Sequence, residues 1–158
     1  MAYLFMGIFV VIASVLVQLS KLWVVNTIPL HTYIPALNGI FNLTYVQNTG
    51  AAFSSFQGMQ WLFALIFALF TAGVIWCFAK KSLPFSTLEK WCVAAIWAGG
   101  LGNMIDRLRL GYVVDMINLE FMDFPVFNVA DCFITCGCIL LMVSLIFFNR
   151  EFWKDEKK

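Results

Sequence analysis

Long apolar segments, separated by polar or turn-rich stretches, dominate the hydrophobic pattern of this chain. Residues 1–20 contain no charged residue, residues 59–79 are predominantly apolar and uncharged, and residues 129–148 are predominantly apolar, with Asp131 as the charged residue among them. About 20 apolar residues cross the ~30 Å hydrocarbon core of a bilayer. The pattern therefore predicts membrane-spanning helices over about residues 3–25, 59–79 and 129–148.

One more span is predicted between residues 79 and 129, and its hydrophobic pattern is less regular. It is the third span in chain order. Only fifteen uncharged residues separate Lys90 from Asp106, which is short for a crossing. A helix over about residues 87–108 therefore carries Asp106 and Arg107 near its far end. The small residues of Gly99–Gly102 allow close approach of neighbouring helices in lipid.

The segment between the first two spans, residues 26–58, has a different pattern. It contains prolines, glycines and asparagines, which break helices. Within it, IFNLTYVQNTGAAF (Ile40–Phe53) is rich in β-branched and aromatic residues and predicts two or three short strands. Because the segment lacks Asp, Glu, Lys and Arg, we expect it to lie on the membrane surface. His31 has no second histidine to join it, so we interpret it as a loop residue rather than a zinc ligand.

Composition supports a membrane protein with one domain over residues 1–158. Of the 158 residues, 62% are hydrophobic and 12% are charged, against roughly 25% charged in soluble domains. No basic patch with interleaved aromatics indicates nucleic acid as a partner. We expect an all-α polytopic membrane protein with four transmembrane helices and a small extracytoplasmic β-cradle between spans one and two.

The basic residues predict the orientation in the membrane. Most of them lie in the loop after the second span and in the tail at residues 149–158: Lys80, Lys81, Lys90, Arg150, Lys154, Lys157 and Lys158. Cytoplasmic loops carry the excess of Lys and Arg. Both termini are therefore expected in the cytoplasm, and the loops at residues 26–58 and 109–128 outside.

A polar cluster follows the glycines of the third span. Asn103, Asp106 and Arg107 are spaced i, i+3, i+4, which places them on one helical face. A structural Asp–Arg pair at the end of the span is the simplest interpretation of Asp106. Lys21, at the end of the first span, either extends to the interface or turns inward and pairs with a carboxylate of this cluster.

Two further carboxylates carry the candidate chemistry. Asp115 lies in a loop between apolar neighbours, so it needs partners or its pKa rises. Asn128 is a good N-cap, and Asp131 then falls at the third helical position, where negative charge is favoured. Asp131 alone is explained equally well as a plain cap residue.

The intervening segment can fold back and bring Asp115 and Asp131 together. Carboxylates in contact share a proton, so one can accept a proton from water while the other donates one. Such a pair can catalyse amide hydrolysis by general acid–base chemistry without a metal or cofactor. The residues alone do not decide which aspartate is the base.

These stretches together resemble the bacterial type II (lipoprotein) signal peptidase family. The matching segments occur in the order found in that family and cover most of the chain: QLSK (Gln18–Lys21), FNLTYVQNTGAAFS (Phe41–Ser54), GGLGNMIDR (Gly99–Arg107), GYVVDMI (Gly111–Ile117) and FPVFNVAD (Phe124–Asp131). The resemblance implies an aspartyl endopeptidase of the inner membrane. Its substrate would be a diacylglyceryl-modified prolipoprotein, cut just before the lipidated Cys, and the enzyme would act as a monomer in contact with membrane lipid.

The resemblance also implies residue roles. Asp115 and Asp131 would form the catalytic dyad, and the substrate-binding residues would be Asn48, Gly50, Asn103, Arg107 and Asn128. The sequence departs from the family at one place, where Val17-Gln18 replaces the usual Asp-Gln before Ser20-Lys21. The alternative is a divergent non-catalytic relative that binds lipoproteins or assists membrane assembly.

Overall fold

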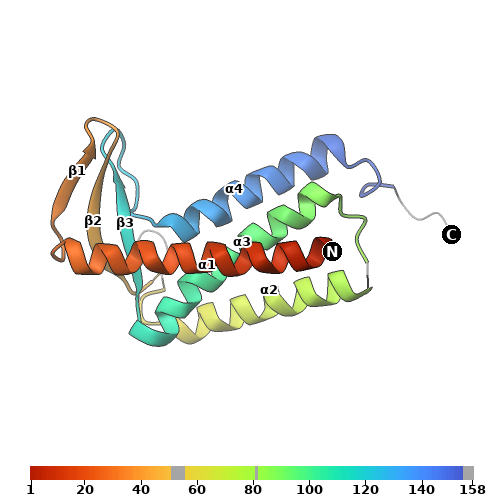
Figure 1. Ribbon diagram of the computed structural model, residues 1–158, viewed down its shortest axis with the longest axis horizontal. Helices are drawn as coiled ribbons and strands as arrows, with labels where there is room; N and C mark the ends of the chain where they lie inside the picture. The colour runs from red at the N-terminus through yellow and green to blue at the C-terminus, as the bar shows by residue number, and fades with distance from the viewer. Residues whose placement is uncertain (51–55, 81, 155–158) are drawn as a thin grey trace.

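The computed structural model describes residues 1–50, 56–80 and 82–154. Within these residues, four α-helices run along one long axis and a small β-sheet stands at one end (Figure 1). The helices are α1 (Ala2–Thr27), α2 (Gln60–Lys80), α3 (Thr87–Leu110) and α4 (Val129–Val143), which a π-helix, η2 (Ser144–Phe148), continues. The N-terminus and η2 lie at the end opposite to the sheet.

Three helical segments of the described chain are long and apolar enough to cross a membrane. They are Tyr3–Thr27, Gln60–Lys80 and Val129–Phe148, and the predicted spans at residues 3–25, 59–79 and 129–148 fall on them. α3 is long as well, but it carries more polar residues. Glu89, Asn103 and Asp106 of α3 are all buried, so these polar groups face protein.

α3 is the central helix, and its glycines explain why. A Cβ atom added at Gly99 would come closer than 3.0 Å to α4, one at Gly100 to the Phe67 side chain of α2, and one at Gly102 to the Val17 side chain of α1. Because these three glycines point in different directions around the axis of α3, three helices can pack closely on it. Gly111, in the left-handed conformation with φ 79°, ends the helix and turns the chain into the sheet.

The sheet is antiparallel, with strand order β1-β2-β3. β1 (Tyr33–Leu37) and β2 (Phe41–Asn48) come from the segment between α1 and α2, as predicted, although residues 51–55 of that segment lie outside the described residues. β3 (Val113–Leu119) comes from the segment after α3, which we had interpreted as a loop. The correction has a physical reason, because β3 finds its hydrogen-bonding partner in β2, about 70 residues earlier, and no local pattern reveals such a pairing.

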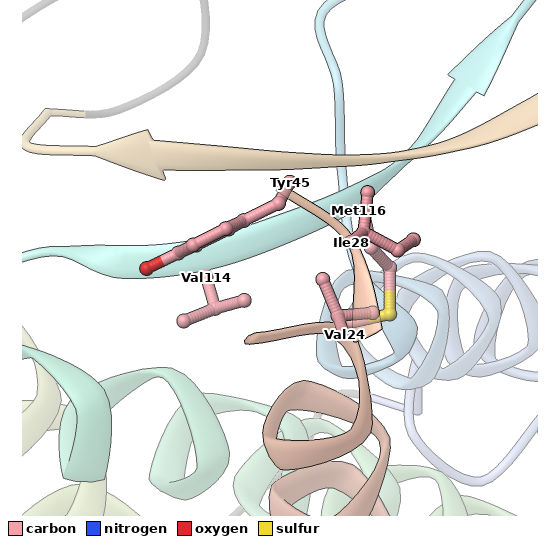
Figure 2. Close-up of a cluster of buried hydrophobic side chains, with 5 residues drawn as sticks. All are labelled: Val24, Ile28, Tyr45, Val114 and Met116. Atoms are coloured by element: carbon pink, nitrogen blue, oxygen red, sulfur yellow. The ribbon is translucent and has the colours of Figure 1, made fainter. Parts of the chain in front are cut away.

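A cluster of buried apolar side chains fixes the sheet to the helices. Val24 and Ile28 at the end of α1 pack with Tyr45 of β2 and with Val114 and Met116 of β3 (Figure 2). Successive side chains of a strand point to opposite faces. Because Val114 and Met116 face this cluster, Asp115 between them faces the other way, toward the start of α4.

Candidate active site

Asp115 is held in the middle of β3, opposite Val46 of β2. Its side chain is buried, and its two oxygens accept hydrogen bonds from Asn48 Nδ2 at 2.9 Å and Asn128 Nδ2 at 2.6 Å. Burial disfavours the charged form more than these hydrogen bonds favour it, which raises the pKa of Asp115 to about 6. The strand, rather than the predicted loop, thus presents a carboxyl group that readily holds a proton.

Asp131 lies in the first turn of α4, in a capping box with Asn128. The Asn128 side chain accepts hydrogen bonds from the backbone N–H groups of Ala130 and Asp131, while Asp131 Oδ2 accepts one from Asn128 N at 2.9 Å. Asp131 Oδ1 accepts a further hydrogen bond from Asn103 Nδ2 at 2.8 Å. The predicted cap is confirmed, and the Asn103 contact goes beyond what a cap requires.

Asn128 connects the two carboxylates. Its Nδ2 donates to Asp115 Oδ1 at 2.6 Å and to Asn103 Oδ1 at 3.1 Å, and Asn103 in turn donates to Asp131. Asn128 is fully buried, so every polar atom of its side chain is used within the protein. Two amide side chains therefore set the positions of both carboxylates relative to each other.

Lys21 turns inward, which decides between the two sequence-based interpretations. Its Nζ forms an ion pair with Asp106 Oδ2 at 2.7 Å and donates to Asn103 Oδ1 at 2.8 Å. Asp106 also accepts hydrogen bonds from Gln18 Nε2 at 3.1 Å and from Val114 N at 3.0 Å. One buried group of charges thus joins α1, α3 and β3 and orients Asn103.

The interpretation of Asp106 as one member of an Asp–Arg pair was wrong. Adjacent residues of a helix point about 100° apart, so Asp106 faces α1 while Arg107 faces α2. The Arg107 guanidinium donates to the Gly50 carbonyl at 3.0 Å and lies over the Phe63 ring, with Cζ 4.2 Å from its centroid. Asn48 accepts from Gly50 N at 2.9 Å, so Arg107 and Asn48 hold the same turn after β2.

The two carboxylates, Asp115 and Asp131, line one cavity of about 680 Å³. Its wall includes every residue that the sequence indicated as catalytic or substrate-binding: Asn48, Gly50, Asn103, Arg107, Asp115, Asn128 and Asp131. Most of the remaining wall is apolar and comes from α2, α3, α4 and the segment before α4, with Phe63, Phe67 and Phe127 among its members. The cavity thus combines a small polar centre with an extensive apolar surface.

Sequence reasoning did not identify the α2 side of this cavity. Phe63, Phe67 and Phe70 line it, but they lie in a helix that is apolar on all sides, so no periodicity distinguishes them.

Gln18 was noted only as part of a polar helix end, yet it hydrogen-bonds to Asp106 and to the Gly102 carbonyl. Val17 is fully buried and occupies the space that Gly102 leaves open. Lys21 obtains its carboxylate partner from α3 rather than from position 17.

Comparison with known proteins agrees with this architecture. The sequence model of the family described as signal peptidase (SPase) II matches residues 8–147. The lipoprotein signal peptidase of Streptococcus agalactiae serotype V is 48% identical over 139 residues, which cover 88% of this chain and 85% of that protein. The lipoprotein signal peptidase of Streptococcus pyogenes serotype M2 is 46% identical over 139 residues, covering 88% and 86%.

Two solved structures of bacterial membrane enzymes share the fold. One, determined by the in meso method at 2.3 Å resolution, has a TM-score of 0.85 and 28% identity, covering 97% of this chain and 93% of that chain. The other, at 1.9 Å, has a TM-score of 0.81 and 27% identity, covering 91% and 94%. Since the family match extends over most of the sequence and the relatives are nearly half identical, this chain belongs to the signal peptidase II family.

Proposed function

We propose that this protein removes the signal peptide from diacylglyceryl-modified prolipoproteins by cutting just before the lipidated Cys, with Asp115 and Asp131 as the catalytic dyad. The observation that carries the proposal is the pair of hydrogen-bond paths from Asn128, one direct to Asp115 and one through Asn103 to Asp131. Both carboxylates line the same cavity. The named relatives are lipoprotein signal peptidases, which supports the choice of substrate.

The environments of the two carboxylates suggest their roles in hydrolysis. Asp115, whose pKa burial raises to about 6, holds the shared proton. Asp131 lies in the first turn of α4, where the helix N-terminus favours negative charge, so we assign it the role of the base. Asp131 takes a proton from a water molecule while the oxygen of that water attacks the scissile carbonyl carbon. At the same time, Asp115 donates its proton to the carbonyl oxygen. When the tetrahedral intermediate collapses, the C–N bond breaks, the proton on Asp131 passes to the amine of the lipidated Cys, and Asp115 takes a proton back from one of the two hydroxyl groups as the carbonyl re-forms.

The remaining polar residues bind substrate or position the dyad. Asn103 and Asn128 hold the carboxylates, and Arg107 with Asn48 fixes the turn at Gly50 beside the cavity. The apolar wall from α2 and α4 suits an apolar signal peptide and the acyl chains of the substrate. No step of this mechanism requires a metal or cofactor.

The setting is a bacterial inner membrane, which the protein spans four times as a monomer. α3 is the remaining span, because its 24 residues reach about 36 Å and its buried polar groups have hydrogen-bond partners within the protein. The sheet forms a cradle on the extracytoplasmic surface, and both termini are cytoplasmic. The basic residues Lys80, Lys90, Arg150 and Lys154 at the end remote from the sheet support this orientation.

A cleavage assay on a lipidated prolipoprotein, read as a gel shift, tests the proposal. Asp115→Asn and Asp131→Asn should each abolish cleavage, since either change removes one member of the proton-sharing pair. Asp123→Asn is the matched control, because Asp123 is an exposed carboxylate outside the cavity. Cleavage that survives both dyad substitutions would exclude the dyad.

The same assay distinguishes the enzyme from a non-catalytic relative. If the unsubstituted protein binds the prolipoprotein but never cuts it, the binding-only alternative is correct. Binding is measured separately, by retention of the lipidated substrate on the immobilised protein. The dyad variants should retain binding while losing cleavage, because the apolar wall of the cavity is unchanged.

A further inference from the structure

A second cavity, distinct from the candidate active site, lies at the end of the bundle remote from the sheet. It has a volume of about 190 Å³ and is formed by the first turns of α1, the last turns of α2 and the start of α3. Tyr3 and Phe78 form one rim, with ring centroids 6.0 Å apart in an edge-to-face contact. None of its lining residues belongs to the site that holds the two carboxylates.

The cavity is an apolar groove with one charge at its rim. From Lys90 to Trp97, both of which line it, α3 rises about 10 Å. Lys90 is the charged residue among the described residues of the wall, and no acidic side chain lines it. Water is a poor occupant, because an ordered water needs two to four polar partners and the deeper wall offers apolar side chains.

Gly7 of α1 also leaves space for a ligand in this groove. A Cβ atom added at Gly7 would meet nothing within 4 Å, so this lining residue leaves the groove open rather than allowing close helix packing. At the bottom, Trp97 is fixed by a hydrogen bond from its Nε1 to Thr71 Oγ1 at 2.9 Å. The groove therefore has a rigid floor, an open side and a cationic rim.

We propose that this groove binds one acyl chain of an anionic phospholipid, whose phosphate is held by Lys90. An apolar channel about two turns deep matches a hydrocarbon chain, and the ammonium at its rim complements an anionic headgroup. With the orientation proposed above, this rim lies in the cytoplasmic leaflet, where anionic lipids attract basic residues. The inference rests on that orientation and is independent of the catalytic dyad.

Lipid binding to the full chain in detergent micelles, followed by native mass spectrometry, tests the proposal. The probes are phosphatidylglycerol and phosphatidylcholine with identical acyl chains. Lys90→Gln should weaken phosphatidylglycerol binding about fivefold, as expected for one lost surface cation. It should weaken phosphatidylcholine binding less, because the choline cation offsets the charge of the phosphate that Lys90 contacts. Lys154→Gln, at an exposed lysine outside the groove, is the control and should change neither.

A second pair of variants tests the groove itself. Gly7→Leu fills it and should weaken binding of both lipids at least tenfold, while Gly73→Leu, at an equally open glycine on α2 outside the groove, should leave binding unchanged. The proposal is overturned if Gly7→Leu binds phosphatidylglycerol as the unsubstituted protein does. It is also overturned if Lys90→Gln behaves like Lys154→Gln.

Discussion

Lys21 of α1 and Asp106 of α3 form a buried ion pair with Nζ and Oδ2 2.7 Å apart, and each side chain is only 3% exposed. The pair holds the end of α1 against the end of α3, at the level where β3 begins. Val114 N of β3 donates to the same Asp106 oxygen. One ion pair thus links the helical bundle to the strand that carries Asp115.

Removing one partner of this ion pair should destabilise the fold strongly. Asp106→Leu leaves the Lys21 ammonium buried without its counter-charge, and we expect a loss of about 3–5 kcal/mol in the free energy of unfolding. Lys21→Met should cost a similar amount. The double variant should lose much less than the sum, because no unpaired charge remains. Unfolding in detergent measures all three, and additive losses would contradict the coupling.

Asn128 should matter more for activity than for stability. Asn128→Ala removes a helix cap, worth about 1 kcal/mol, and also releases Asp115 from its 2.6 Å hydrogen bond. We expect kcat to fall about 100-fold, the scale of losing one positioned hydrogen-bond donor. Asn118→Ala in the same strand as Asp115, but outside the cavity, serves as control. Equal activity of the two variants would show that Asn128 is only a cap.

The packing of α4 on α3 should control the position of Asp131. A Cβ at Gly99 would press on the carbonyl oxygen of Ala130, the residue before Asp131. Gly99→Ala should therefore shift the start of α4, cost about 1–3 kcal/mol and reduce cleavage. Gly73→Ala, where a Cβ meets nothing within 4 Å, should be neutral or slightly stabilising. Unchanged stability of Gly99→Ala would mean that α4 moves away freely.

The raised pKa of Asp115 predicts how stability depends on pH. Its ordinary value is 3.8 and its folded value is about 6, so between these values the folded state holds a proton that the unfolded state has released. The free energy of unfolding therefore falls as pH rises from about 4 to 6. The difference in pKa corresponds to about 3 kcal/mol.

Replacing the carboxyl group should remove this dependence. The stability of Asp115→Asn relative to the unsubstituted protein should increase by about 3 kcal/mol between pH 3 and pH 8. Thermal unfolding across this pH range measures the difference, with Asp123→Asn as the exposed control. A difference between the two proteins that is constant with pH would contradict the assigned pKa.

Much of the site was predictable because its signals are local. An apolar segment of spanning length is recognised from about 20 consecutive residues. An asparagine at a helix start with a carboxylate three positions later is recognised from a few residues. Asp115 was identified for a similar reason, since a carboxylate between apolar neighbours needs partners. The placement of β3, the partner of Lys21 and the α2 wall of the cavity were not predictable, because each depends on contacts between residues far apart in the chain.

By itself, the sequence determined the apolar helices, the strands before α2, the cap at Asn128 and the two candidate carboxylates. Each of these follows from hydrophobic length, residue propensity or capping chemistry, which act over short distances. The tertiary structure decided that Asp115 lies on a strand and that Lys21 pairs with Asp106. It also decided that Asn103 and Asn128 join the two carboxylates in one cavity. The close packing of three helices on the glycines of α3 makes these long-range contacts, and no local pattern encodes which side chains they bring together.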